Sequence, residues 1–297
     1  PRSTPLYSSA ASDVYKRQGY GTRFLPATKA VPKEMLPILT KPLLQYGVEE
    51  ALSAGILNMA IVTGRGKRSI EDHFDNAFEL ESQLSGTSKE SYLDEIKEVI
   101  EKATFTYVRQ QKMLGLGHAI LTGEPLIGDE PFAVILADDL CDCGSSGAIS
   151  QMIDIYKKHQ CSIIAIEEIS FNDIEKYGVI FGDLIDGTDD TYRVNKMLEK
   201  PDLKDLNELA KDEVDMKNKP NFMGIIGRYI LTPDIFEILK NIKPDKGGEI
   251  QITDALLVQA KQGKVIAYKY RGKRFDCGSV DGFVKAINHY AKQQGIT

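Results

Sequence analysis

Short apolar runs alternate with segments of helical hydrophobic periodicity along most of this chain. Residues 132–136 (FAVIL) contain no polar position, so both faces of a strand there must be buried. Strands of this kind, separated by helices, are typical of a parallel sheet that helices cover on both sides. We therefore predict an α/β fold with a mostly parallel, mixed sheet and helices on both faces.

The positions of the elements follow from local patterns. Strands are predicted at residues 58–63, 104–108, 132–136, 162–166, 177–181, 193–198 and 222–231. Helices are predicted from Pro42 to Gly55 and near residues 147–158 and 250–261, with further helices carrying Ile70, Phe74 and Phe78, and Leu93, Ile96 and Ile100. The charged stretch 202–219 is interpreted as a solvated loop or a surface helix. No repeat or linker interrupts residues 19–297, which we expect to form a single domain.

Residues 1–18 do not share this pattern. They are rich in Ser, Ala and Pro and show neither strand nor helix periodicity. They also lack the basic start and the apolar core of a signal peptide. We expect this segment to be an aberrant leader that is not part of the fold.

Composition excludes several classes of protein. The 37 Lys and Arg residues against 43 Asp and Glu give a net charge of −6, which disfavours general nucleic-acid binding. No apolar stretch approaches the ~18 residues of a membrane span, so we expect a soluble protein with no membrane partner. The four cysteines show no metal-ligand spacing, which indicates reduced thiols and a cytoplasmic location.

A glycine turn opens the patterned part of the chain. Gly19 and Gly21 stand two residues apart, and backbone N–H groups in such a turn can approach a phosphate closely. The dinucleotide-binding pattern G-x-G-x-x-G is not completed, because Phe24 occupies the third glycine position. A nicotinamide-dependent dehydrogenase is therefore disfavoured.

A basic segment follows the glycine turn. It contains four cations and one acid, Glu34, and prolines at positions 26, 32 and 37 stiffen it; the cations are Arg23, Lys29, Lys33 and Lys41. A rigid cationic loop beside a glycine turn can neutralise a triphosphate and a departing pyrophosphate. We therefore predict a triphosphate site.

Two separated acids are candidates for a metal site. Asp138 and Asp139 end the apolar run 132–136, and the carboxyl end of a buried strand is the ligand-binding edge of an open α/β sheet. Asp276 stands alone between hydrophobic and turn residues late in the chain. If the fold brings Asp276 near Asp138, the two carboxylates suit Mg²⁺. The four histidines have no nucleophile at motif spacing, so acyl-transfer chemistry is unsupported.

Seven motifs in order make the chain resemble a known family. They are residues 19–26 (GYGTRFLP), 32–37 (PKEMLP), 109–110 (RQ) with 115–119 (GLGHA), 199–201 (EKP), 227–229 (GRY), 248–254 (GEIQITD) and 275–278 (FDCG). Together they are similar to the bacterial UTP:glucose-1-phosphate uridylyltransferases, also called UDP-glucose pyrophosphorylases. The resemblance covers about residues 19–290, and the combination is specific where each motif alone is weak.

The resemblance implies a Rossmann-like nucleotidyltransferase that makes UDP-glucose and pyrophosphate from UTP and glucose 1-phosphate with Mg²⁺. By motif, it implies catalytic roles for Arg23, Lys33 and Lys200, nucleotide binding by Gly19, Gly21, Gln110 and Gly115, sugar binding by Tyr177, Gly178 and Glu199, and metal binding by Asp138 and Asp276. It also implies a homo-oligomer, a dimer or a tetramer.

Two further hypotheses remain open at this point. A glucose-1-phosphate thymidylyltransferase shares the fold and most motifs, and a non-catalytic sugar-nucleotide-binding protein would be expected to lack some of the cations and acids. The family's first strand also has no apolar counterpart here, since residues 1–18 stand in its place. We therefore expect the sheet to lack this central strand.

Overall fold

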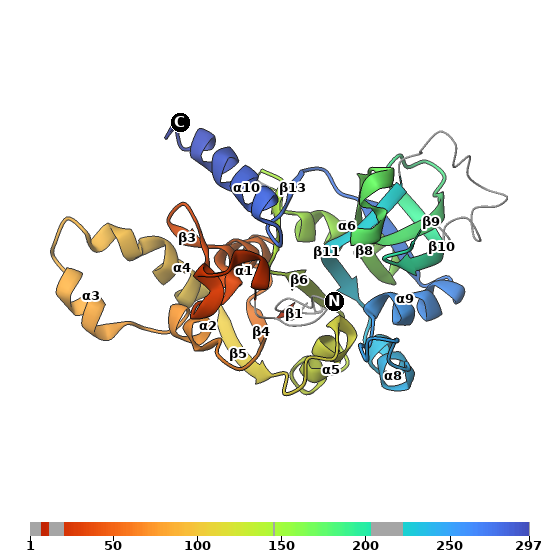
Figure 1. Ribbon diagram of the computed structural model, residues 1–297, viewed down its shortest axis with the longest axis horizontal. Coiled ribbons are helices and arrows are strands. Elements are labelled where there is room, and N and C mark those ends of the chain that lie inside the picture. The colour runs from red at the N-terminus through yellow and green to blue at the C-terminus, as the bar shows by residue number, and fades with distance from the viewer. Residues whose placement is uncertain (1–6, 12–20, 145, 203–221, 297) are drawn as a thin grey trace.

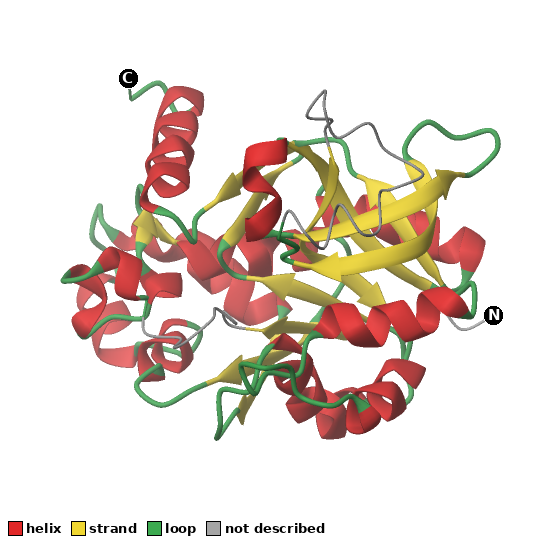
Figure 2. Cartoon of the chain, turned by 45° about the vertical axis from the view of Figure 1, so that its right-hand side comes forward, coloured by secondary structure: helices red, strands yellow, loops and turns green. Residues whose placement is uncertain are grey.

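A nine-stranded mixed sheet forms the centre of the computed structural model, which describes residues 7–11, 21–144, 146–202 and 222–296 (Figures 1 and 2). The strand order is β5 (Thr104–Arg109), β4 (Asn58–Thr63), β1 (Tyr7–Ala11), β6 (Phe132–Leu136), β11 (Phe222–Leu231), β8 (Ser162–Ile169), β12 (Val265–Lys269), β10 (Thr191–Glu199) and β9 (Gly178–Leu184). Strands β5, β4, β1 and β6 are parallel, whereas β11 pairs antiparallel with β6, β8 and β9. The sheet is mixed as the sequence predicts, but the expectation that it is mostly parallel is wrong, because five of the nine pairings between its described strands are antiparallel.

Helices cover both faces of the sheet. One layer contains α1 (Leu43–Ser53), α2 (Arg68–His73), α4 (Asp94–Lys102) and α6 (Ala148–His159), and the other contains α5 (Leu116–Ile127), α8 (Asp234–Asn241) and α9 (Ile252–Lys261). In β6, Phe132 and Val134 pack under the second layer, while Ala133 and Ile135 pack under the first. The prediction that this strand is buried on both faces is confirmed.

Two small pairs of strands and two helices lie beside the main sheet. The strand β7 (Asp139–Asp142) pairs antiparallel with β13 (Lys273–Asp276), and β2 (Pro37–Ile38) pairs with β3 (Lys41–Pro42). The helix α10 (Val280–Gln293) follows β13, and α3 (Phe78–Leu84) extends from the end of the molecule opposite β9 and β10 (Figure 1). The β7–β13 pair matters most, because it joins the two predicted metal-binding segments.

The expectation that residues 1–18 lie outside the fold is wrong for Tyr7–Ala11. These residues form β1 in the middle of the parallel half, where Ala10 stands opposite Ile61 of β4 and Ile135 of β6. Strand pairing uses backbone N–H and C=O groups, which Ser and Ala supply as well as larger residues do. A strand therefore fills the central slot; residues 1–6 and 12–18 lie outside the described residues.

One predicted helix is divided in two. The pattern of Ile70, Phe74 and Phe78 predicts a single buried face, but α2 ends at His73 and α3 begins at Phe78. Phe74 is buried, whereas the Phe78 side chain is 78% exposed. Asp75 accepts a hydrogen bond from the Asn76 backbone N–H, a local bond that competes with helix continuation. The predicted charged loop at 202–219 falls almost wholly outside the described residues.

Candidate active site

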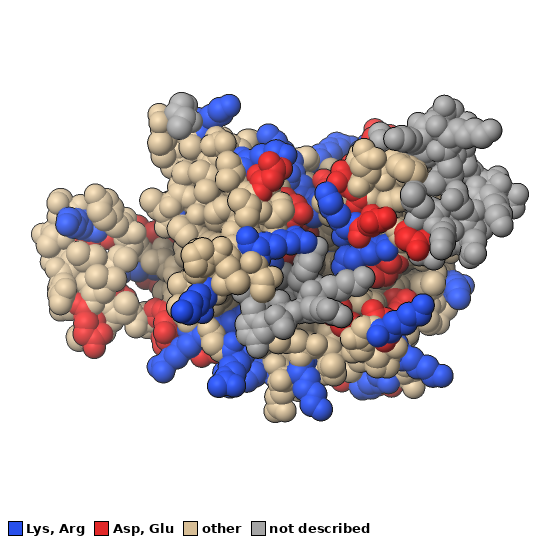
Figure 3. All heavy atoms as spheres, viewed as in Figure 1, with Lys and Arg blue, Asp and Glu red and all other residues tan. Residues whose placement is uncertain are grey.

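A cavity of about 300 Å³ lies at the carboxyl end of β6 and is open to solvent. It is lined by residues from distant parts of the chain, and seven of them are among the predicted site residues: Arg23, Asp138, Tyr177, Gly178, Glu199, Lys200 and Asp276. On the face shown in Figure 3, acidic and basic side chains gather beside one another between α10 and the strands β9 and β10. The fold thus brings most of the predicted site to one place.

Lys33 reaches this cavity through an ion pair. It begins the short 3-10 turn Lys33–Met35, its side chain is buried, and its Nζ lies 3.0 Å from Asp138 Oδ2. Gly21 packs against the same segment with φ of +58°, and a Cβ at this position would stand 3.2 Å from Lys33 Cβ. The glycine is needed here both for its backbone conformation and for space. Gly19, the other glycine of this turn predicted to bind the nucleotide, lies outside the described residues.

Asp138 and Asp276 converge on one point. Because β7 and β13 pair, the Cys277 N–H donates a hydrogen bond of 2.8 Å to the Asp138 carbonyl. A Cβ built on Gly278 would stand 2.9 Å from Asp138 Oδ2 and 3.0 Å from Asp276 Oδ1. Both carboxylates therefore face the same small space, which the missing side chain of Gly278 leaves open. Arg23 Nη1 donates to the Gly278 carbonyl at 3.2 Å and closes one side.

Asp139 has a structural role next to the cavity. Its carboxylate is buried, and it accepts hydrogen bonds from the Gly227 N–H at 2.8 Å and from Arg274 Nε at 2.6 Å. Arg274 also bonds Glu167, and its guanidinium lies 4.8 Å from the ring centre of Tyr177. Arg274 thus joins Asp139, which follows the predicted metal ligand Asp138, to the predicted sugar residue Tyr177, a role that the sequence motifs did not indicate.

The three predicted sugar residues, Tyr177, Gly178 and Glu199, line the same cavity. Gly178 of β9 pairs with Glu199 of β10, and a Cβ on Gly178 would stand 3.3 Å from Glu199 Oε2. Thr253 donates to that same oxygen at 2.6 Å, a contact that sequence reasoning missed. Lys200 Nζ lies 3.1 Å from Glu199 Oε1, and its backbone adopts φ of +44°. A left-handed lysine is strained, and such strain concentrates at functional positions.

Gln110 and Gly115 lie next to each other at the carboxyl end of β5. Gln110 Nε2 donates to the Gly115 carbonyl at 3.3 Å and lies 3.0 Å from His118 Nδ1. Gly115 has φ of +93°, and a Cβ there would stand 2.8 Å from the Ile250 carbonyl oxygen. Burial lowers the pKa of His118, so its neutral ring can accept this hydrogen bond. These residues adjoin Leu116, which lines the cavity.

The basic segment does not act as one cluster. Lys41 Nζ pairs with Glu49 at 2.9 Å, on the side of α1 that faces α4. Glu34 is buried and paired with Lys67, so it does not neutralise Lys33. The prediction of a continuous cationic loop is therefore wrong for Lys41. From this segment Arg23 lines the cavity, and Lys33 is joined to it through the ion pair with Asp138, while Lys200 lines it from another segment.

Comparison with known proteins identifies the family. The sequence profile described as nucleotidyl transferase matches residues 18–293. The chain belongs to the nucleotidyl transferase family. The matched range begins immediately before the glycine turn and includes every predicted site residue.

Close relatives within the nucleotidyl transferase family narrow the comparison. The chain is 56% identical over 276 residues to the UTP–glucose-1-phosphate uridylyltransferase of Pseudomonas aeruginosa, covering 93% of this chain and 94% of that protein. Two solved UDP-glucose pyrophosphorylase structures each cover 97% of this chain and 99% of theirs. The apo structure is 53% identical with a TM-score of 0.85, and the complex with UDP-glucose is 51% identical with a TM-score of 0.82. The predicted Rossmann-like nucleotidyltransferase fold is confirmed.

Proposed function

We propose that the protein transfers the uridylyl group of UTP to glucose 1-phosphate, which yields UDP-glucose and pyrophosphate. The observation that carries this proposal is that Asp138, which pairs with Lys33, and Asp276 line one cavity together with Glu199 and Lys200. Cations and carboxylates of this kind suit two phosphate groups and a sugar. The relatives named above carry the same activity in their names.

Each of the two substrates can be assigned a set of protein residues that would bind it. Gly19, Gly21, Gln110 and Gly115 would hold the nucleotide, and Arg23 and Lys33 its triphosphate. Tyr177, Gly178 and Glu199 would hold the glucose. Lys200 would face the sugar phosphate, since its Nζ lies in the cavity beside Glu199. A carboxylate can accept two sugar hydroxyls at once, and an amide offers both a donor and an acceptor to a pyrimidine edge.

The proposed reaction requires the two substrates to be positioned relative to each other, and it requires no covalent intermediate with the protein. The second pKa of a phosphate monoester is about 6, so glucose 1-phosphate is mostly dianionic at neutral pH and needs no general base. Its oxygen would attack the α-phosphorus of UTP in line, and pyrophosphate would leave from the opposite side. Holding the two anions together can supply roughly 7–11 kcal/mol of the barrier. Lys33 and Arg23 would stabilise charge on the leaving pyrophosphate.

The two carboxylates fit Mg²⁺. Both Asp138 Oδ2 and Asp276 Oδ1 lie about 3 Å from the point where a Gly278 Cβ would stand, so the space between them is bounded by oxygens. No cluster of three or more acidic, His or Cys ligands is found among the described residues. Mg²⁺ typically takes one or two carboxylates and completes its shell with water and substrate phosphates. When bound, the ion would offset charge on the phosphates.

Oligomeric state and location belong to the same proposal. A dimer or tetramer of this chain is proposed, with α10 as one contact surface, because Val280 and Val284 are about half exposed on it. Within the described part of the chain, no helix is long and apolar enough to cross a membrane. The four cysteines are free thiols, as a cytoplasmic enzyme would require.

Competition between nucleotides tests the substrate assignment. The purified protein would be incubated with Mg²⁺, glucose 1-phosphate and equal concentrations of UTP and dTTP, and the sugar nucleotides would be separated by anion exchange. The proposal predicts mainly UDP-glucose. Mainly dTDP-glucose would instead support the thymidylyltransferase alternative, and no sugar nucleotide would support a binding protein.

A further inference from the structure

Two neighbouring residues of one turn are held by buried ion pairs that lead to different strands. Lys33 and Glu34 both belong to the 3-10 turn Lys33–Met35, and both are buried. Lys33 Nζ lies 3.0 Å from Asp138 Oδ2, in the segment after β6. Glu34 Oε1 lies 2.5 Å from Lys67 Nζ, in the segment after β4. Since β4 and β6 are the two strands that pair with β1, the turn is held between them.

The geometry of the turn explains why its side chains diverge. A 3-10 helix has three residues per turn, so consecutive side chains point about 120° apart. Lys33 accordingly contacts Asp138 and Glu34 contacts Lys67, while Met35 packs against the hydrophobic cluster that includes α1. Only one orientation of the turn satisfies all three contacts at once. The proposed roles above use the Lys33 contact and assign nothing to the Glu34–Lys67 pair.

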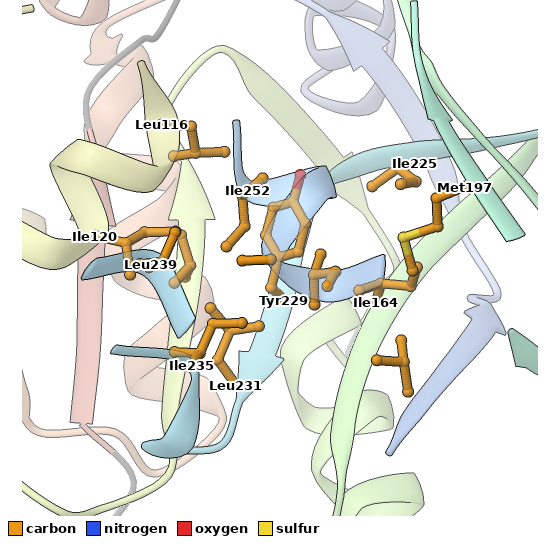
Figure 4. Packing of buried hydrophobic residues seen from close by; sticks show 14 of the residues in the cluster. Leu116, Ile120, Ile164, Met197, Ile225, Tyr229, Leu231, Ile235, Leu239 and Ile252 are labelled. Atoms are coloured by element: carbon orange, nitrogen blue, oxygen red, sulfur yellow. The ribbon is translucent and has the colours of Figure 1, made fainter. Parts of the chain in front are cut away.

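Lys67 is a fixed anchor for Glu34. It lies between β4 and α2, and its carbonyl accepts a 3.0 Å hydrogen bond from the Ile70 backbone N–H. Ile70 is fully buried, which holds the start of α2 against the sheet. Strands β4 and β6 are fixed in turn, since Val62 and Val134 belong to one buried cluster, part of which is shown in Figure 4. The sheet therefore sets the distance between the two ion-pair partners of the turn.

The carboxylate of Glu34 depends on Lys67. The Glu34 side chain is 1% exposed and that of Lys67 is 10% exposed. Removing one partner of a buried ion pair is strongly destabilising, because the other charge stays buried without compensation. Without the Lys67 ammonium group, the Glu34 carboxylate would have to move toward water. Because Glu34 directly follows Lys33 in the chain, this movement would displace Lys33 Nζ from Asp138.

We propose that Glu34 and Lys67 are positioning residues, which hold the Lys33 ammonium group beside Asp138. This inference rests on the proposed function, in which Lys33 stabilises the leaving pyrophosphate. Neither Glu34 nor Lys67 lines the cavity, and each contacts the other, so they act through Lys33 and not on a substrate. A cation that is fixed before the reaction needs no reorganisation when charge develops on the pyrophosphate.

The first test compares wild type with Lys67→Met, which removes the charge of Lys67 and keeps an unbranched side chain. Lys41→Met is the matched control, since Lys41 Nζ also pairs with a carboxylate, that of Glu49, at 2.9 Å but does not line the cavity. We expect Lys67→Met to lower kcat between about tenfold and 100-fold, because a displacement of about 1 Å in a positioned group can cost that much. The KM for glucose 1-phosphate should not change, because Lys33 is assigned to the triphosphate. Lys41→Met should leave kcat as in wild type.

A double-mutant cycle distinguishes positioning from a general structural effect. Lys67→Met is introduced into Lys33→Ala, and kcat is measured for the double variant. If Lys67 acts through Lys33, the second change should lower kcat by no more than about twofold. A further loss as large as the one in the wild-type background would show that Lys67 acts independently of Lys33, and would overturn the inference.

A pair without charge tests whether the unpaired carboxylate is the cause. Glu34→Leu combined with Lys67→Met leaves no unpaired buried charge, and apolar replacement of a buried ion pair is often neutral for stability. The double variant should regain kcat to within about threefold of wild type, because nothing draws the turn toward water. This variant also serves if Lys67→Met does not fold. A folded double variant as slow as Lys33→Ala would overturn the inference.

Inhibition by pyrophosphate gives a readout at the leaving group. The inhibition constant of pyrophosphate should rise about tenfold in Lys67→Met, because the cation assigned to the leaving group is displaced, and should not rise in Lys41→Met. An unchanged kcat in Lys67→Met, or an inhibition constant equal to that of wild type, would overturn the inference while wild-type turnover leaves the proposed function standing. Absence of turnover by the wild type would overturn both.

Discussion

Lys33 Nζ and Asp138 Oδ2 lie 3.0 Å apart although 105 residues separate them in the chain. Both side chains are shielded from solvent, with 6% and 16% of their surface exposed. In such an environment a charge pair is screened less than at the surface. The pair therefore links the basic segment after the glycine turn to the carboxyl end of β6, where the metal and the triphosphate are proposed to bind.

Lys33→Ala should lower kcat at least about 100-fold, because it removes the fixed cation that we propose stabilises the leaving pyrophosphate. Lys29→Ala is the control, since Lys29 stands four residues earlier on the same segment and is exposed. Rates of UDP-glucose formation and circular dichroism spectra would be recorded for both. A Lys33→Ala protein that is folded and retains most of its turnover would contradict the role given to this lysine.

Asp276→Asn should raise the Mg²⁺ concentration needed for half-maximal activity by about tenfold or more, because one of the two proposed carboxylate ligands is lost. Asp281→Asn, whose carboxylate is 77% exposed, serves as the control. Activity would be titrated with Mg²⁺ at saturating substrates. Identical titration curves for wild type and Asp276→Asn would remove Asp276 from the metal site.

Gly278→Ala tests the same space without removing a charge. The new Cβ would stand about 3 Å from both carboxylate oxygens and would occupy the space proposed for the ion. A Mg²⁺ requirement raised about tenfold is expected. Gly64→Ala is the matched control, because a Cβ there meets no atom within 4 Å. If both variants titrate like wild type, the ion does not sit between Asp138 and Asp276.

Arg228→Leu should destabilise the fold by about 3–5 kcal/mol, since it leaves the Glu50 carboxylate buried without its partner. Arg228 Nη2 lies 2.8 Å from Glu50 Oε2, and their side chains are 1% and 7% exposed. Urea denaturation would measure the change. Arg68→Ala, which breaks a largely exposed pair with Asp72, should leave the free energy of unfolding unchanged within error. Equal effects of the two changes would contradict this interpretation.

Protonation of His73 should lower the free energy of unfolding as the pH falls. Burial lowers the pKa of His73, whose Nε2 lies 2.9 Å from Gln45 Oε1. The unfolded chain therefore binds the proton first, so this contribution is complete above about pH 6.5 and is lost as the pH falls through the lowered pKa. Between pH 7.5 and 5, His73→Gln should lose less unfolding free energy than wild type or the exposed His159→Gln. An equal loss in all three would exclude His73 as a source.

Local sequence patterns correctly predicted those helices and strands whose own apolar residues indicate that they are buried. The run Phe132–Leu136 is apolar throughout, and it forms a central strand as expected. The strand β1 could not be predicted in this way, because Ser and Ala in Tyr7–Ala11 carry no hydrophobic signal while the pairing itself is made by the backbone. The antiparallel position of β11 between β6 and β8 likewise depends on long-range pairing.

For the site, sequence motifs identified seven of the residues that line the cavity, but not the contacts by which these residues are held in place. Arg274 contacts Asp139, Glu167 and Tyr177, which lie about 100 or more residues away in sequence, so no local pattern shows this network. Conversely, Lys41 belongs to the basic segment by sequence but pairs with Glu49 instead. Charge alone predicts that cations gather near a phosphate site, while packing decides which of them reach it.

Pyrophosphate release from UTP, followed with and without glucose 1-phosphate, tests the central claim most directly. If the cavity holds both anions so that one attacks the other, pyrophosphate should appear only when UTP, glucose 1-phosphate and Mg²⁺ are all present, in equal amount to UDP-glucose. Pyrophosphate release from UTP without the sugar phosphate, or no release when all three are present, would contradict the account.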